Sequence, residues 1–258
     1  MSTFKITLAY DGTDFIGWQR QANGASIQGL LEDALKRLDE RDVTVHGAGR
    51  TDAGVHALGQ VASFSLARAV TPDVVRRSLN SMLPPEVRVL TAEHVPDTFH
   101  ARFDARSKTY RYRIWNADVL DPFEHGRVWH VVHPLDVDAM RDGAGRLVGQ
   151  HDFAGFQGTG SEVVTTVREV LRSEVITTED DTLRVLRGES LISYEITGDG
   201  FLRHMVRAIA GSLVEIGRGR RPPAWIDEVL ASRDRSAAGQ TAPAEGLFLV
   251  RVAYAPRS

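Results

Sequence analysis

Phe4-Lys5-Ile6-Thr7-Leu8-Ala9-Tyr10 places apolar residues at every second position near the start of the chain. A period of two is typical of a β-strand that buries one face. Asp11-Gly12-Thr13 then interrupts the alternation with turn-forming residues. The stretch therefore predicts a half-buried first strand, and the elements that follow it decide which kind of sheet it joins.

Helix and strand patterns alternate after this first strand. Ser26 is suited to cap a helix whose apolar residues 27, 30, 31, 34, 35 and 38 lie on one face. Thr71-Pro72 predicts the start of a second helix, because proline is favoured in the first helical turn. Further strands are expected at residues 43–46, 60–65 and 87–95.

The rest of the chain repeats this order. Asp136 is suited to cap a helix, and Gly217 to end a strongly apolar one that begins at residue 201. A short helix is expected at residues 223–231, and strands at residues 109–115, 168–176, 183–186, 191–197 and 247–254. Each half of the chain therefore reads strand–helix–strand–strand–helix–strand, which is the ferredoxin-like order.

These patterns predict an α+β protein made of two ferredoxin-like (βαββαβ) halves, residues 1–105 and 106–258. We expect the halves to form a mostly antiparallel sheet with helices on one face. An active-site groove is expected between the halves.

Composition excludes several classes of function. The chain has no cysteine, which excludes disulfides, a thiolate nucleophile and cysteine-based metal centres. It has no run of eighteen apolar residues, so we expect no membrane span. Residues 1–9 lack the layout of a secretory signal. Together these features predict a cytoplasmic protein.

The net charge of −3 gives no sign of a nucleic-acid partner, yet basic residues gather in two places. Such clustering can produce a basic face on an acidic protein, although solvated strand and helix faces are the simpler explanation from the charges alone. The two clusters contain Arg102, Arg106, Lys108, Arg111 and Arg113, and Arg203, His204, Arg207, Arg218, Arg220 and Arg221.

The most informative stretch is the polar, glycine-rich segment at residues 46–57, between two expected strands. Its three glycines permit tight turns and close approach of a ligand. Arg50 and Asp52 lie on the same side if this segment is extended. Taken alone, the segment is more simply explained as a loop with a surface Arg–Asp pair.

Six ordered blocks change that interpretation. The segment Gly49-Arg50-Thr51-Asp52-Ala53-Gly54-Val55-His56-Ala57 resembles the signature of the tRNA pseudouridine synthase A (TruA) family. The resemblance extends over nearly the whole chain. The other blocks are Tyr10–Gln19, Phe99–Phe103 with Lys108–Tyr112, Asp152-Phe153 with Phe156, Phe201–Arg207 and Ala244–Leu249.

The resemblance implies an isomerase that converts uridine to pseudouridine at positions 38, 39 and 40 of the tRNA anticodon stem-loop. The glycosidic bond from ribose C1′ to uracil N1 breaks, the base rotates, and it reattaches through C5. Because neither oxidation nor phosphate transfer occurs, no cofactor and no metal are expected. The resemblance also implies a homodimer that binds tRNA, with the basic clusters holding phosphates.

The resemblance also assigns the site residues. Asp52 matches the family's catalytic carboxylate, Arg207 the arginine that compensates its charge, and Tyr110 the active-site tyrosine that can stack on uracil. The target base is stacked within the stem and must be flipped out, and we expect Arg50 to occupy the vacated space. His56 is expected to be structural.

Several alternatives stay open from the residues. Asp52 could attack uracil C6 or ribose C1′, or remove a proton on a glycal route, and the tRNAs that are modified are not specified. A non-catalytic RNA-binding module would need exposed aromatic residues on its sheets but no carboxylate. A metal-dependent nuclease would need two or three converging acids or histidines, whereas this loop supplies Asp52 and His56.

Overall fold

The computed structural model describes residues 1–160, 163–178 and 190–255 of the chain. The chain forms two compact units, one made of Met1–Arg106 with Phe248–Ser258 and the other of Ser107–Leu247. Both combine strands with helices, so the protein is α+β, as expected. The strand expected at residues 183–186 lies outside the described residues.

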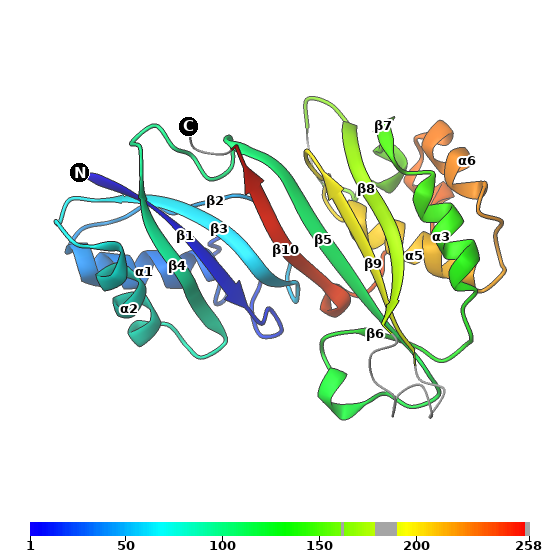
Figure 1. The fold of residues 1–258 in the computed structure, drawn as a ribbon, viewed down its shortest axis with the longest axis horizontal. Helices are drawn as coiled ribbons and strands as arrows, with labels where there is room; N and C mark the ends of the chain where they lie inside the picture. The colour runs from blue at the N-terminus through cyan, green and yellow to red at the C-terminus, as the bar shows by residue number, and fades with distance from the viewer. Residues whose placement is uncertain (161–162, 179–189, 256–258) are drawn as a thin grey trace. The chain divides into compact units, whose positions relative to one another are not determined.

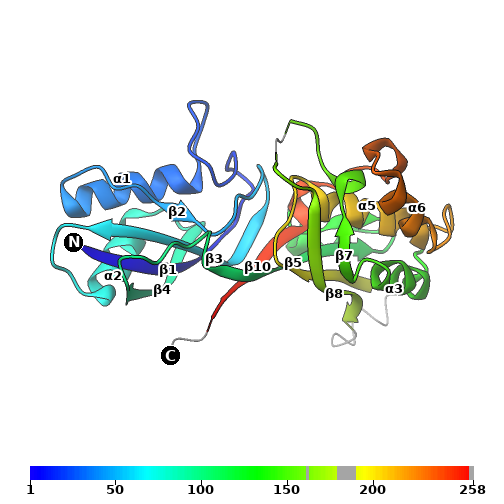
Figure 2. The same ribbon diagram turned by 90° about the horizontal axis from the view of Figure 1, so that it is seen from above.

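The first unit has a mainly antiparallel sheet in the strand order β4-β1-β3-β10. Strand β1 pairs antiparallel with β3 and β4, β2 pairs antiparallel with β3, and β10 pairs parallel with β3. Helices α1 and α2 lie on one face of this sheet (Figures 1 and 2). The elements are β1 (Ser2–Tyr10), α1 (Ile27–Asp39), β2 (His46–Gly47), β3 (His56–Leu66), α2 (Pro72–Met82), β4 (Val87–Val95) and β10 (Leu247–Tyr254).

The sequence signals explain where these elements begin and what they bury. The Ser26 hydroxyl accepts a hydrogen bond from the Gly29 amide, and Thr71 caps α2 in the same way. In β1 the predicted alternation places Phe4 opposite Phe64 of β3, and their rings stack at 5.9 Å. The even-numbered side chains of β1 therefore form the core beneath the helices.

One expected strand is much shorter than its sequence indicates. Residues 43–46 were expected to be extended and paired, but β2 covers only His46–Gly47. The physical reason is that helix α1 takes the backbone groups of Val45. Gln28 Nε2 donates to the Val45 carbonyl oxygen at 3.0 Å, and the Val45 amide donates to Glu32 Oε1 at 3.3 Å.

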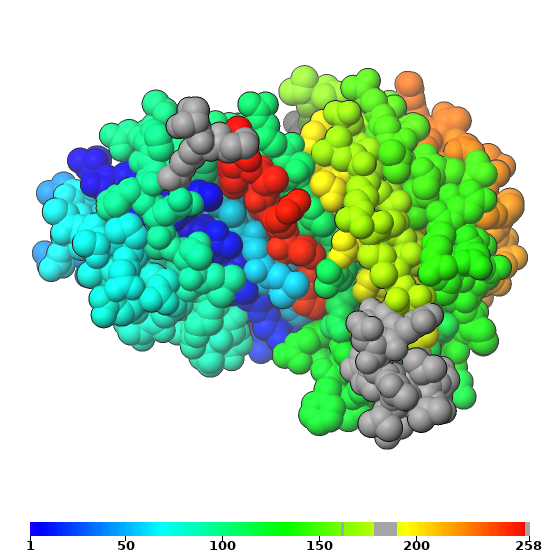
Figure 3. Space-filling view, viewed as in Figure 1, coloured from blue at the N-terminus to red at the C-terminus, as the bar shows by residue number. Residues whose placement is uncertain are grey.

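The second unit has a sheet in the order β5-β9-β8-β7, with all three pairings antiparallel. Strand β6 pairs parallel with β5. Strand β8 lies at the surface in the space-filling view (Figure 3), and its Leu171 is 52% exposed. The elements are β5 (Ala105–Asn116), β6 (Trp129–Val131), α3 (Val137–Gly145), β7 (Gly149–Asp152), β8 (Val167–Thr178), β9 (Ser190–Gly198), α5 (Met205–Gly217) and α6 (Trp225–Ser232).

Among the described residues, four short 3₁₀ helices join these elements: η1 (Pro122–Glu124), η2 (Ala154–Phe156), η3 (Arg235–Ala237) and η4 (Ala244–Gly246). Helix α5 ends at Gly217 as predicted, but it begins at Met205 rather than at residue 201. His204 has a φ of 59°, and this left-handed conformation is incompatible with a helix that continues through it.

The last strand of the chain belongs with the first unit. Phe248 and Leu249 of β10 pair with His56 and Ala57 of β3. The two compact units therefore differ from the sequence halves 1–105 and 106–258 in this strand. Within the described residues, no helix is long and apolar enough to cross a membrane.

Candidate active site

Asp52 lies in the loop that connects β2 to β3 in the first unit. Its side chain is half-buried, the preceding Thr51 is buried, and Arg50 is exposed. Gly54 has a φ of +75°, so the loop turns at a position that favours glycine. The loop thus presents a carboxylate that is partly accessible to solvent and partly covered by neighbouring residues.

Buried polar side chains hold the loop on both sides of Arg50. The hydroxyl groups of Tyr10 and Thr51 lie 2.9 Å apart in a hydrogen bond. Gln60 Nε2 donates to the Gly49 carbonyl oxygen at 2.9 Å and approaches the Tyr10 hydroxyl at 3.4 Å. Burial raises the pKa of Tyr10 to about 12, so its hydroxyl stays neutral and keeps this bond at physiological pH. The residue before Asp52 is therefore anchored to the sheet.

The segment after β1 holds the loop from the other side. The Trp18 amide donates to the Thr51 carbonyl oxygen at 3.0 Å, and the Gly54 amide donates to the Phe15 carbonyl oxygen at 3.3 Å. A Cβ on Gly12 would lie only 2.1 Å from the Val55 carbonyl oxygen. This close approach requires glycine, and it explains why a motif near the chain start accompanies the Asp52 motif.

His56 begins β3 immediately after the loop and is 1% exposed. Its Nδ1 accepts a hydrogen bond from the Gly12 amide at 2.9 Å, and its ring stacks on Phe248 at 4.6 Å. These contacts give His56 a structural role, because they join the loop, the segment after β1 and β10.

Tyr110 and Arg207 lie in the second unit, on β5 and α5. Tyr110 is buried, and its ring meets that of Phe201 edge to face at 5.0 Å. Arg207 Nε donates to the Ala242 carbonyl oxygen at 2.7 Å, while the Ala242 amide donates back to the Arg207 carbonyl oxygen at 3.1 Å. The guanidinium group is thus held by the segment that precedes β10.

Tyr112 was not singled out from the sequence, yet it supports the same segment. Its hydroxyl donates to the Pro243 carbonyl oxygen at 2.7 Å, next to the carbonyl that Arg207 contacts. Burial raises the pKa of Tyr112, whereas the charge of Arg207 lowers it. Tyr112 lies two residues after Tyr110 on the same strand, so the two side chains share a face. This spacing was the sequence signal that could have identified Tyr112.

Many of the clustered basic residues are neutralised locally. Arg111 pairs with Glu195 at 2.6 Å and Arg113 with Glu124 at 2.8 Å. Glu215 pairs with both Arg218 and Arg220. The sequence clusters therefore overstate the positive charge that the second unit offers to a phosphate backbone.

Metal coordination finds no support in the described part of the chain. No group of three or more histidine, aspartate or glutamate side chains there could hold a metal ion. What the first unit offers instead is a single carboxylate on an anchored loop. A carboxylate in this setting can act as a nucleophile or a base without a metal.

Comparisons with known proteins agree with this chemistry. A family profile described as tRNA pseudouridine synthase matches residues 6–104 and 144–255. A tRNA pseudouridine synthase A from Brevibacillus brevis is 46% identical over 254 residues, which cover 98% of this chain and 100% of that protein. The protein of the same name from Myxococcus xanthus is 45% identical, with 98% of this chain and 92% of that protein covered.

A third relative, the tRNA pseudouridine synthase A from Syntrophotalea carbinolica, is 43% identical over 100% of this chain and 98% of its own length. A solved structure of a Cbf5–Nop10–Gar1 complex matches 82% of this chain and 45% of that chain at 11% identity. Its TM-score of 0.33 is too low to bear on the fold. From the family profile and these relatives, the chain belongs to the tRNA pseudouridine synthase family.

Proposed function

We propose that this chain is an isomerase that converts uridine to pseudouridine at positions 38, 39 and 40 of the tRNA anticodon stem-loop. Family membership over nearly the full chain is the observation that carries this proposal. The anchored Asp52 loop supports it, because a positioned carboxylate can act as the nucleophile or base in isomerisation at a glycosidic bond. We also propose that the protein is cytoplasmic, where tRNA would be its substrate.

Asp52 is the proposed catalytic carboxylate. The reaction balances without an added reactant: the bond from C1′ to N1 breaks, the bond from C1′ to C5 forms, and the C5 proton leaves while N1 gains one. The bonds to Thr51 and Gly49 fix the backbone beside Asp52, so that its carboxylate meets the base in one geometry. Such positioning is the main contribution the loop itself makes.

Tyr110, Arg207 and Arg50 are proposed to bind the same uridine as Asp52. Tyr110 would stack on the uracil ring, and the guanidinium of Arg207 would balance the charge of the carboxylate. The contacts of Arg207 with Ala242 support this role, because they hold the guanidinium in one orientation. Arg50, exposed on the loop, would fill the space left by the flipped base.

A ferredoxin-like build of both halves is part of this proposal. The order β4-β1-β3, with β2 also paired to β3, supports it for the first half. We further propose a homodimer, in which the combined surface of two copies holds one tRNA.

The direct test is to map pseudouridine in an unmodified tRNA transcript after incubation with the purified protein. We expect modification at positions 38–40, and a loss of at least about a thousandfold in Asp52→Asn, which keeps the shape of the side chain but not its charge. Asp73→Asn, an exposed aspartate on helix α2 of the same unit, is the matched control and should keep its rate.

The same assay separates the alternative functions. A wild-type rate in Asp52→Asn would contradict the catalytic assignment and favour a binding module. Loss of activity in a chelator would favour a metal-dependent enzyme instead. Formation of pseudouridine only outside the anticodon stem-loop would retain the reaction and overturn the proposed target.

A further inference from the structure

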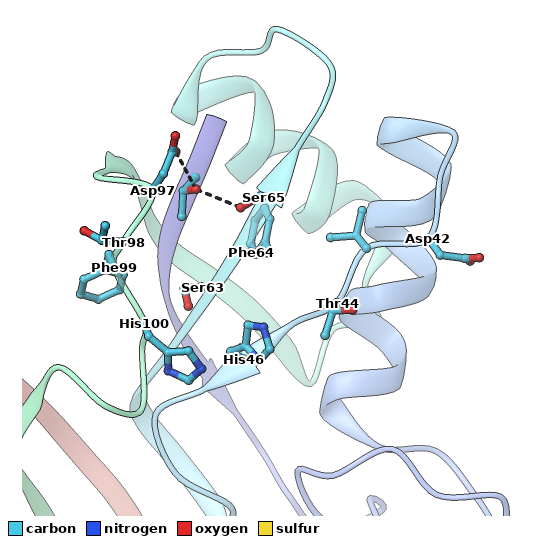
Figure 4. A pocket seen from close by; sticks show the side chains of 12 residues that line it. Asp42, Thr44, His46, Ser63, Phe64, Ser65, Asp97, Thr98, Phe99 and His100 are labelled. Carbon is cyan, nitrogen blue, oxygen red and sulfur yellow. Dashed lines mark hydrogen bonds between the residues drawn. The ribbon is translucent and has the colours of Figure 1, made fainter. Parts of the chain in front are cut away.

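A pocket of about 340 Å³ lies in the first unit, and no residue of the Asp52 loop lines it. Residues 42–46, which lead into β2, form one wall, and residues 97–100 form the other. Thr3, Ser63 and Ser65 of strands β1 and β3 contribute to its floor. Figure 4 shows the imidazole rings at one end of this space and a carboxylate with two hydroxyl groups at the other.

His46 and His100 lie at one end of the pocket, with Phe103 beside them. The His46 and His100 rings lie 4.7 Å apart, and the His100 ring lies 4.3 Å from that of Phe103. His46 is exposed, and Phe103 is 74% exposed. His100 cannot turn freely, because its Nδ1 accepts the backbone amide of Arg102 at 3.1 Å. Exposed aromatic rings are surfaces on which unpaired bases stack.

The other end of the pocket is rich in hydrogen-bond acceptors. Thr3 Oγ1 donates to Asp97 Oδ1 at 2.9 Å, and it lies 2.9 Å from Ser65 Oγ. Because the Thr3 proton goes to the carboxylate, the Ser65 hydroxyl must donate to Thr3. The remaining oxygen lone pairs of Asp97 and Ser65 are therefore acceptors, and a ligand at this end must bring N–H or O–H donors.

Charge argues against a phosphate in this pocket. The Asp97 carboxylate would repel it, and the lining contains no lysine or arginine. Burial and the charge of neighbouring His46 lower the pKa of His100 below its ordinary value, so its ring is neutral at physiological pH. A planar, neutral ligand with an amino group fits both ends of the pocket, since it can stack at one end and donate at the other.

We propose that this pocket binds an unpaired, amino-bearing nucleobase of the tRNA, stacked beside His46 and hydrogen-bonded to Asp97. The inference rests on the proposed function for its substrate, but it concerns a base other than the target uridine. The bound base would hold the RNA on the unit that carries Asp52. Adenine, cytosine and guanine supply an exocyclic amine with two N–H donors, whereas uracil offers only its single N3–H.

The test compares two substitutions with matched controls by measuring the Kd for an unmodified tRNA transcript. We expect Asp97→Asn, which replaces one acceptor with a donor, to weaken binding about fivefold. His46→Ala should weaken it by about tenfold through lost stacking. Asp73→Asn and His133→Ala should retain the native Kd. Asp73 is exposed on helix α2, outside the pocket, and pairs with Arg76 and Arg77, and His133 is exposed in the second unit.

The salt dependence of binding shows whether a variant has lost a contact with a base or with a phosphate. A base contact releases no counterions, so both variants should keep the native slope of log Kd against log salt concentration. A reduced slope would mark a phosphate contact and overturn the proposal. Native Kd values in both variants would also overturn it, and binding of free adenosine or cytidine by the native chain alone would then assign the pocket to a nucleoside.

Failure of this proposal is distinct from failure of the proposed function. Affinity for tRNA is measured without turnover, whereas pseudouridine mapping reports the reaction. If the native chain forms no pseudouridine, the proposed function fails whatever the Kd values are. If it forms pseudouridine and the Kd values do not change, only the pocket assignment fails.

Discussion

Thr51 is held by the hydroxyl of Tyr10, a residue 41 positions earlier in the chain. Tyr10→Phe removes this bond without changing the shape of the ring. We expect the free energy of unfolding to fall by about 1 kcal/mol. We also expect kcat to fall about tenfold with little change in KM, because the Asp52 loop shifts while the RNA-binding surface stays intact. Denaturant titration and steady-state kinetics would measure the two effects.

A second buried tyrosine provides the control for this substitution. The hydroxyl of Tyr194 lies 3.0 Å from that of Ser173, in the sheet of the second unit. Tyr194→Phe should cost a similar free energy of unfolding but leave kcat within about twofold of native. Equal losses of kcat in the two variants would show that Tyr10 acts only through overall stability.

His100 should make the stability of the protein depend on pH. Its folded-state pKa is lowered, first by burial and then by His46, while Asp104 opposes the shift. The folded state therefore binds this proton less readily than the unfolded state, and stability falls as pH drops below about 6.5. The free energy of unfolding of native protein should decrease more between about pH 7 and 5 than that of His100→Gln. Parallel pH curves would contradict this expectation.

For individual residues, the sequence predicts the candidate catalytic residue better than the side chains that hold it in place. The motif picks out Asp52 because the glycines and the acid lie together in one short segment. Tyr10 and Gln60, which anchor that segment, come from strands that meet it only in the folded chain. Local periodicity predicts the strands but not which side chains they bring together, so these supports could not be identified from the sequence.

Among the helices, α5 depends on a close approach to the segment that holds Arg207. A Cβ on Gly211 would lie 1.8 Å from the Gln240 carbonyl oxygen, so alanine there must displace the backbone. Gly211→Ala should reduce the free energy of unfolding by about 3 kcal/mol. It should also reduce kcat, because residues 239–242 move away from Arg207. Thermal unfolding and kinetics would measure both changes.

A glycine in α3 offers the matched control. A Cβ on Gly145 would meet nothing within 4 Å beyond its own helix, so alanine is not obstructed there. Gly145→Ala should leave the stability unchanged or raise it by up to about 1 kcal/mol, because alanine favours the helix. A comparable loss in both variants would mean that the effect at Gly211 is not one of close packing.

Helices and strands were predicted well where capping residues and periodicity agree. Ser26 and Asp136 each accept the expected capping hydrogen bond, and α2 begins at Pro72 as predicted, with Thr71 as its cap. The prediction was wrong at residues 43–46 because α1 side chains take the backbone groups of Val45. It was also wrong at the start of α5, since the left-handed His204 leaves no sign in the apolar pattern.

For the whole molecule, the order of elements does not specify which sheet a strand joins. The alternating apolar residues of β10 predict a strand equally well in either half. Its pairing with β3 depends on a parallel contact between chain segments nearly two hundred residues apart, from His56 to Phe248. Only the folded chain shows that its last strand belongs to the unit that carries Asp52.

This pairing predicts how the first unit unfolds. Leu249 is fully buried in β10, and Leu249→Ala should lower the free energy of unfolding by about 3 kcal/mol. Because β10 pairs with β3, the backbone amides of β3 should exchange hydrogen faster as well. Leu171→Ala, on the exposed face of β8, should change stability by less than about 0.5 kcal/mol. Faster exchange confined to β10 would show instead that the last strand frays alone, and the unit would then not depend on the end of the chain.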